Sequence, residues 1–201
     1  MNLDSIRRRR MALRTQMREK VRAAILDAAE ELIAEKGLQG TALTQIAAKA
    51  GVAVGTLYNY FEDRDAMVRA LFETRRATLR PKLLAAIGAG KELAFEPRLR
   101  TFMRALFQAF EEHRRYVKVV FSAEHLKPQG SHADLRAAVA EMVVAGVAEG
   151  VIAKSSAEIV EIMLIGSLRA VLVHRVETGG SFPEVADAVV SLVLDGARRK
   201  R

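Results

Sequence analysis

Cysteine is absent from this sequence of 201 residues, and so are long apolar runs. Without cysteine the chain can form no disulfide and offers no thiolate to a metal, which fits a reducing compartment. An uncharged stretch near the end, Ile162–Leu168, stops at Arg169, far short of the roughly 18 apolar residues of a membrane span. Arg7–Arg10 is reminiscent of an export signal, but no apolar stretch follows. We therefore expect a soluble, cytoplasmic protein.

Signatures of catalysis are missing as well. The four histidines are scattered through separate predicted elements, and neither an HExxH zinc pattern nor a GxSxG nucleophile elbow occurs. We expect no enzymatic activity, no metal site and no cofactor.

The charge balance is basic, with 32 Lys and Arg residues against 24 Asp and Glu residues and a net charge of +8. Such an excess suits a partner rich in phosphate, although many basic proteins bind no nucleic acid. Half of the residues are apolar, so the chain has enough for a substantial core in one domain, or in a small module beside a larger one.

The most informative stretch runs from Thr41 to Arg64 and reads TALTQIAAKAGVAVGTLYNYFEDR. Its first half predicts a short helix over 42–50 that ends at Gly51, where glycine tolerates a positive φ. A second short helix begins near Val54, with Leu57 and Phe61 spaced to face inward. Two short helices joined by a tight turn, the second with polar and aromatic groups outside, are typical of a helix-turn-helix.

The run from Ile46 to Met67, IAAKAGVAVGTLYNYFEDRDAM, resembles the DNA-binding core of the TetR family of bacterial transcription regulators. The resemblance rests on the IA pair, the AGV turn, the GTLY segment and the aromatic end. Two positions depart from the family's usual pattern: Ala42 and Ala53 stand where hydroxyl side chains often cap the two helices. We leave open which residue caps the first of them.

The resemblance also implies which residues contact DNA. By position in the motif, five residues approach base edges, and these are Thr44, Val54, Gly55, Thr56 and Asn59. Three others contact phosphate, and these are Tyr58, Tyr60 and Arg64. Val54 can offer only apolar contact, for instance to a thymine methyl group.

A basic arm over residues 1–20 precedes this motif, with seven basic residues against two acidic ones. Adjacent like charges favour an extended or frayed arm. Two readings stay open: its arginines enter the minor groove, or a solvated tail or frayed helix extension attracts phosphate without sequence preference.

The remaining pattern is helical throughout, which predicts an all-α fold in three parts. These are the arm at 1–20, a three-helix DNA-binding domain at 21–66, and a helical regulatory and dimerisation domain at 67–201. We expect a long helix over 63–84 that Pro81 bends or ends, and a connection over 85–97. Five further helices then follow, with a loop over 127–132.

The helix over 157–176 has apolar residues around nearly its whole circumference, which predicts burial on all sides. We expect its spare face to meet a second subunit, with Gly166 and Ala170 allowing close approach, and a final helix over 182–197 to complete the interface.

The body also suggests a small-molecule pocket, because it is rich in phenylalanine and methionine. Ordinary core packing is the alternative for each such residue. Arg169 interrupts an apolar helix, where it binds an anionic ligand, pairs with an acid at a dimer interface or reaches out to solvent. The candidate ligand residues are Met103, Phe107, Phe121, Met142 and Arg169.

Together these observations predict a homodimeric DNA-binding regulator, most simply a repressor that a largely apolar effector releases from its operator. The alternatives are a basic architectural DNA-binding protein, or a helical small-molecule-binding protein without specific DNA affinity. The sequence identifies neither the effector nor the operator.

Overall fold

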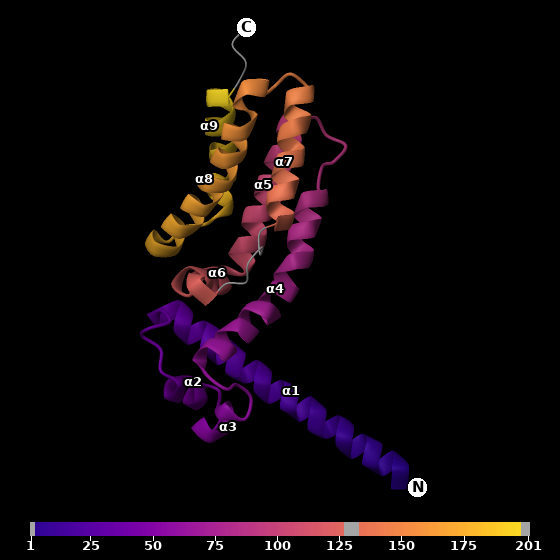
Figure 1. The fold of residues 1–201 in the computed structure, drawn as a ribbon, viewed down its shortest axis with the longest axis vertical. Helices are drawn as coiled ribbons and strands as arrows, with labels where there is room; N and C mark the ends of the chain where they lie inside the picture. Colours follow the sequence, from indigo (N-terminus) through magenta and orange to yellow (C-terminus); the bar gives the residue numbers. More distant parts are fainter. Residues whose placement is uncertain (1–2, 127–132, 198–201) are drawn as a thin grey trace. The chain divides into compact units, whose positions relative to one another are not determined.

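The computed structural model describes residues 3–126 and 133–197, and within these ranges it confirms the all-α prediction (Figure 1). The α-helices are α1 (Leu3–Lys36), α2 (Leu43–Lys49), α3 (Val54–Tyr58), α4 (Arg64–Gly88), α5 (Phe95–Glu112), α6 (Arg114–Ser122), α7 (Ala133–Ala148), α8 (Ala157–Thr178) and α9 (Ala186–Ala197). Short 3-10 helices are η1 (Glu124–Leu126), η2 (Lys154–Ser156) and η3 (Pro183–Val185). No described helix is both long and apolar enough to cross a bilayer.

The chain divides into two compact units. The N-terminal unit comprises Met1–Thr74 with Lys118–Lys127, and the C-terminal unit comprises Arg75–Val117 with Pro128–Arg201. The division therefore falls inside α4, after Thr74, rather than after residue 66. Helices α4 and α6 each contribute residues to both units.

Helix α1 organises the N-terminal unit and is much longer than the predicted helix over 21–36. Its C-terminal half buries Ile25, Ala29 and Leu32, and α1 packs against α2. Its N-terminal half continues the same helix through residues 3–20. Of the alternatives left open for the arm, the extension of the helix matches residues 3–20 and an extended arm does not. Arginine, glutamine and methionine are strong helix formers, and the anchored half supplies the nucleus.

The long helix α4 also exceeds its predicted length. It continues past Pro81 to Gly88, and α5 begins at Phe95, so the predicted connection over 85–97 is too long at both ends. Pro97 lies in the first turn of α5, where a missing N–H interrupts no helical hydrogen bond. The predicted loop over 127–132 lies outside the described residues.

The C-terminal unit is a helical bundle whose core is built on α5. Helix α5 packs against α7 and α9, and α8 packs against both α7 and α9. Leu99, Phe102, Leu106 and Phe110 recur on one face of α5 and are buried. The five helical segments predicted for the body are confirmed as α5 to α9.

Helix α8 buries only one stripe within the single chain. Val160, Leu164, Leu168 and Leu172 follow one another at four-residue steps and are at most 6% exposed. Other apolar side chains of α8 are exposed, including Ile162 at 58%. Burial on all sides is therefore not achieved by this chain alone.

A cluster around Arg114 fastens the segment that follows α8. The Arg114 guanidinium donates to Glu111 Oε1 at 2.8 Å and to the Arg175 carbonyl at 3.1 Å. It also lies 4.1 Å from the centre of the Phe182 ring. Glu111 Oε2 accepts the backbone N–H of Phe182 at 2.8 Å. Three helices, α5, α6 and α8, and the segment before α9 are thus joined by charge-assisted hydrogen bonds.

These hydrogen bonds lower the pKa of Glu111, chiefly through the bond from Arg114, against a smaller opposing effect of burial. A carboxyl group with a depressed folded-state pKa stabilises the fold above its ordinary pKa and loses that contribution as pH falls through the folded value. We predict that Glu111→Gln costs about 1–2 kcal/mol at neutral pH, and that this cost shrinks as the pH falls below the ordinary carboxyl range.

Chemical denaturation of the wild type and of Glu111→Gln at several pH values measures this difference. Glu112→Gln is the matched control, because the Glu112 side chain is 43% exposed and pairs with Lys82 at the surface. An equal effect of both substitutions at every pH would contradict the assigned role of Glu111.

Candidate nucleic-acid interface

The short helix α3 is held in place by its buried side. Leu57 is fully buried and Phe61, just after the helix, is 5% exposed. Ile46 and Ala47 of α2 are buried as well, and α2 packs against α3. A helix of five residues is not stable alone in water, so its position depends on this packing.

The turn between α2 and α3 has the geometry that the sequence predicted. Gly51 has a φ of 71°, which a side chain other than glycine's rarely adopts. The Val52 N–H donates to the Ala47 carbonyl at 3.0 Å, and the Gly51 N–H donates to the Ala48 carbonyl at 3.1 Å. These bonds satisfy the end of α2 and set where α3 begins.

The start of α2 shows which residue takes the capping role left open by the sequence. The Gln45 side chain accepts the Ala42 backbone N–H at 3.3 Å, which is one half of a capping box. Thr41 acts elsewhere: its buried hydroxyl donates to the Gly37 carbonyl at 2.8 Å, at the end of α1. Ala53 precedes α3 and makes no side-chain cap, because its methyl group cannot accept a hydrogen bond.

The residues predicted to contact DNA lie on α2 and α3, just after α3, and at the start of α4. Thr44, Gly55, Tyr58 and Asn59 are exposed, and the Tyr58 side chain is exposed over half its area. Val54, Thr56, Tyr60 and Arg64 are half-buried. A Cβ atom built on Gly55 would meet no other atom within 4 Å, so nothing in the fold itself requires glycine there.

Arg64 has a partner inside the domain. Its guanidinium donates to the Leu38 carbonyl at 3.2 Å and so ties the start of α4 to the loop after α1. The same region is capped by Asp63, whose Oδ1 accepts the Ala66 N–H at 2.6 Å. The structure therefore gives Arg64 a positioning role that the motif did not indicate.

Two arginines of α1 were also missed by the sequence reasoning. The Arg18 guanidinium lies 5.8 Å from the centre of the Tyr60 ring, and that of Arg22 lies 5.7 Å from the centre of the Phe61 ring. Both distances suit cation–π contacts. The available signal was helical spacing, since Arg18 precedes the buried Ile25 by seven residues and Arg22 precedes the buried Ala29 by seven.

The candidate ligand residues fall into different environments. Met103 and Phe107 on α5 and Met142 on α7 are at most 2% exposed in the core of the C-terminal unit. Phe121 is half-buried and belongs to the N-terminal unit. Arg169 is exposed on α8. Three of the five thus share one core, and neither Phe121 nor Arg169 is buried in it.

Among the described residues, no group of three or more His, Asp or Glu side chains is arranged to hold a metal ion. What the N-terminal unit presents is an anchored two-helix motif with polar and aromatic side chains outside, which defines a helix-turn-helix domain.

Comparison with known proteins identifies the helix-turn-helix segment. Residues 25–71 match the model of the bacterial regulatory proteins of the tetR family. The fatty acid metabolism regulator protein of Bacillus subtilis is 43% identical over 51 residues, which span 25% of this chain and 26% of that protein. The chain spans between 25% and 45% of the length of the first curated relatives that it matches. Residues 25–71, which hold the helix-turn-helix, are thus of the TetR type.

Solved structures extend the likeness of fold beyond the matched segment. FadR from Bacillus halodurans has a TM-score of 0.71 at 22% identity, covering 89% of this chain and 97% of that one. FadR from Bacillus subtilis, solved in complex with stearoyl-CoA, has a TM-score of 0.68 at 19% identity, covering 88% and 99%. At such identities the likeness concerns the fold alone.

Proposed function

We propose that the protein is a sequence-specific DNA-binding transcription regulator that acts as a repressor. The observation that carries the proposal is the division of α3 into a buried side, which Leu57 fixes, and an exposed side that carries Tyr58 and Asn59. A helix held in this way can enter the major groove, where base edges are read. Such an activity takes place in the cytoplasm of a bacterium, where the DNA lies.

In this proposal the eight predicted residues make two kinds of contact with DNA. Thr44, Val54, Gly55, Thr56 and Asn59 approach base edges, and Tyr58, Tyr60 and Arg64 lie near phosphates. The open space at Gly55 supports close approach of a DNA backbone, because a side chain there would meet the duplex rather than the protein. Tyr58 supports a phosphate contact, because its hydroxyl lies on an exposed ring.

The proposal predicts a marked preference for the operator. DNA from upstream of the protein's own gene should bind at least roughly 10³-fold more tightly than scrambled DNA of equal length at about 150 mM salt. Tyr58→Phe and Thr56→Ala should each weaken operator binding by roughly tenfold, since each removes one hydrogen-bonding group.

Electrophoretic mobility shifts or fluorescence anisotropy measure these affinities. Gln39→Ala is the matched control, since Gln39 is exposed on the loop after α1. Weak, salt-sensitive binding to every duplex, including those selected from a random pool, would instead favour the architectural alternative. Ligand binding with no DNA affinity would favour the third alternative.

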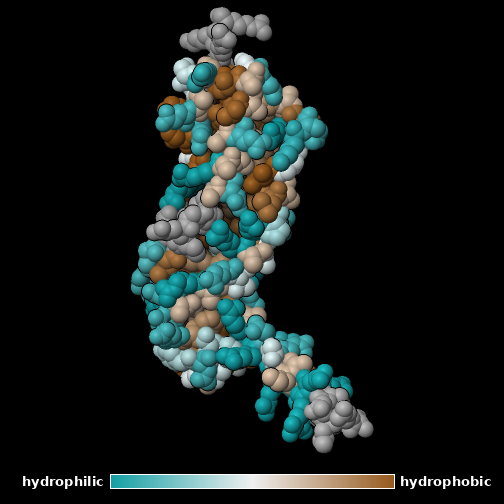
Figure 2. Space-filling view, turned by 45° about the vertical axis from the view of Figure 1, so that its right-hand side comes forward, coloured by the Kyte–Doolittle hydropathy of each residue, from teal (hydrophilic) through white to brown (hydrophobic). Residues whose placement is uncertain are grey.

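We further propose that the protein acts as a homodimer through α8 and α9. Ile159, Ile162 and Met163 on α8 are exposed at 44% or more, and Leu192 on α9 is exposed at 76%. Helices α8 and α9 pack together, and Figure 2 shows apolar side chains exposed on the visible face of the C-terminal unit. Covering large exposed apolar side chains favours association.

Gly166 also supports the proposal that this face of α8 contacts a second subunit. A Cβ atom there would meet nothing within 4 Å, although glycine in a helix interior costs roughly 0.5–1 kcal/mol relative to alanine. A dimer would also present two recognition helices to a two-fold symmetric operator.

Ile162→Glu is predicted to shift the protein from dimer to monomer by placing a charge on this face, with operator affinity falling at least roughly a hundredfold. Sedimentation velocity measures the oligomeric state. Leu84→Glu, at an exposed apolar residue of α4, should leave the dimer intact. A stable Ile162→Glu dimer would place the interface elsewhere.

The effector is proposed to be largely apolar and to bind among Met103, Phe107 and Met142 in the C-terminal unit, with Arg169 of the same unit recognising an anionic group. The buried phenylalanine and methionine side chains of α5 and α7 support an adaptable apolar site. Release would follow if the effector binds a body conformation different from the one that binds DNA.

Stearoyl-CoA is the first probe, because the FadR structure of similar fold binds it. We predict that it stabilises the protein, by about 2.7 kcal/mol at one hundred times its dissociation constant, and that it releases operator DNA. Thermal unfolding with stearoyl-CoA, free stearate or coenzyme A alone separates the contributions of chain and headgroup. If none of them shifts unfolding of the intact dimer, acyl-CoA is not the effector.

A further inference from the structure

The N-terminal half of α1 has no packing role that accounts for its composition. Residues 7–20 are all exposed, and seven of the first twenty residues are basic. Among the side chains described from residue 7 onward, none forms an ion pair with Arg7, Arg14 or Arg18. A rigid, strongly basic helix therefore extends the domain without being part of its core.

The arginines of this helix are not spread evenly around it. At about 3.6 residues per turn, positions 7, 11 or 18 residues apart lie on one face of a helix. Arg18, Arg14 and Arg7 precede the buried Ile25 by these three spacings, so they continue the face that α1 buries in the domain. We call Arg7, Arg14 and Arg18 the arginine stripe.

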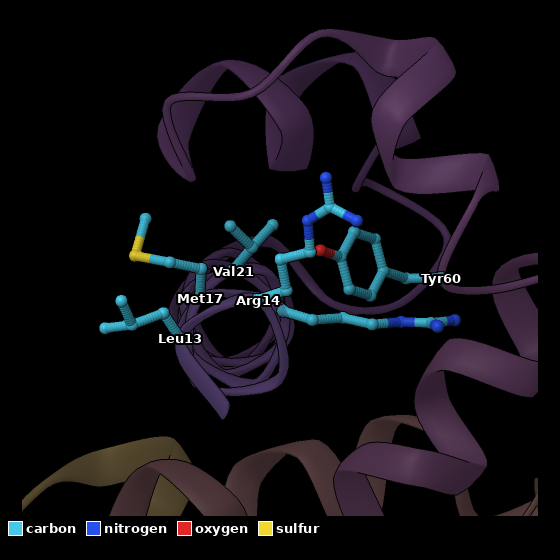
Figure 3. A pocket seen from close by; sticks show the side chains of 6 residues that line it. Leu13, Arg14, Met17, Val21 and Tyr60 are labelled. Carbon is cyan, nitrogen blue, oxygen red and sulfur yellow. The ribbon is translucent and has the colours of Figure 1, made fainter. Parts of the chain in front are cut away.

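The inner end of the stripe lies against the end of the helix-turn-helix. Arg14 and Arg18 line an open pocket with Tyr60, Leu13 and Met17, and Figure 3 shows the Tyr60 ring directed toward α1. Tyr60 follows Asn59, the last exposed residue of the proposed reading surface. The stripe therefore starts beside this surface and runs about 16 Å from Arg18 to Arg7 at 1.5 Å per residue.

The helical state of this segment decides between its two possible DNA contacts. An α-helix with its side chains is about 10–12 Å across, whereas the minor groove is about 6 Å wide. The segment cannot thread the minor groove as an extended arm does. Its arginines can instead neutralise phosphates, which follow one another along the duplex at the pitch of the bases.

We infer that the arginine stripe is a second DNA-contacting element, which binds the phosphates flanking the operator sequence and lengthens the footprint by about five base pairs per protomer. The inference rests on the proposed function, because it requires a duplex docked on α3. The partner is the sugar-phosphate backbone, and the contact is independent of base sequence.

The test compares two double variants that remove the same charge. Arg7→Gln with Arg14→Gln alters the stripe, whereas Arg9→Gln with Lys20→Gln alters the opposite face of the same helix. Glutamine keeps the helix propensity in both, and circular dichroism checks the helix content. Binding is measured across a salt series on operator DNA and on scrambled DNA.

We expect the salt dependence of the stripe variant to be weaker: the negative slope of the logarithm of the DNA-binding constant against the logarithm of salt concentration becomes shallower by about two per protomer. Binding to both duplexes should be at least roughly tenfold weaker. The opposite-face variant should change the affinity less than roughly threefold. Hydroxyl-radical footprinting should show loss of the outer protection, with protection at the operator centre retained.

Equal effects of the two variants would overturn the inference and leave only general attraction of a basic helix. Unchanged footprints and slopes in the stripe variant would do the same, while specific operator binding would still support the proposed function. If the wild-type protein binds operator DNA and scrambled DNA equally, the proposed function fails. The two double variants are then compared on scrambled DNA alone.

A basic helix that carries Leu13 and Met17 beside its arginines is also compatible with binding to an anionic membrane. Vesicles of phosphatidylglycerol and phosphatidylcholine in equal parts test this reading. Vesicle binding that the stripe variant loses, together with unchanged DNA binding, would assign the stripe to lipid and overturn the inference.

Discussion

The packing of α1 against the helix-turn-helix is the interaction on which the proposed DNA-binding surface depends. Helix α3 has five residues and α2 has seven, and helices of this length do not persist alone in water. Leu57 and Ile46 are buried in a core to which α1 contributes Ile25 and Ala29. The outer residues can therefore be chosen for contact with DNA, because the inner ones fix the geometry.

Much of this unit could be predicted from residue patterns, because local rules and the motif agree. The glycine at position 51 signals the turn, and Leu57 and Phe61 signal the buried side. The roles of Thr41 and Arg64 could not be predicted, since both donate to carbonyl groups that the folded chain brings near, those of Leu32 and Leu38. A sequence motif identifies which residues matter, whereas their hydrogen-bond partners are determined by the tertiary structure.

Helix lengths differ from those predicted where two local effects compete. In residues 3–20, repulsion between arginines opposes helix formation, but each exposed pair costs only a few tenths of a kcal/mol, and the anchored half removes the cost of nucleation. Past Pro81, the run of leucine and alanine likewise favours continued helix. For α8, composition predicts that a large apolar surface is buried. It does not indicate whether the same chain or a second copy of it buries that surface.

The absence of a side chain at Gly166 determines what a substitution there would reveal. Within one chain the glycine weakens α8 and makes room for nothing, since no atom approaches the missing side chain. Substitution by alanine would strengthen the helix of an isolated chain, so a measured loss of function there would report a contact made outside it. The effect of substituting Gly166 therefore reports on contacts with other molecules rather than on the fold of the single chain.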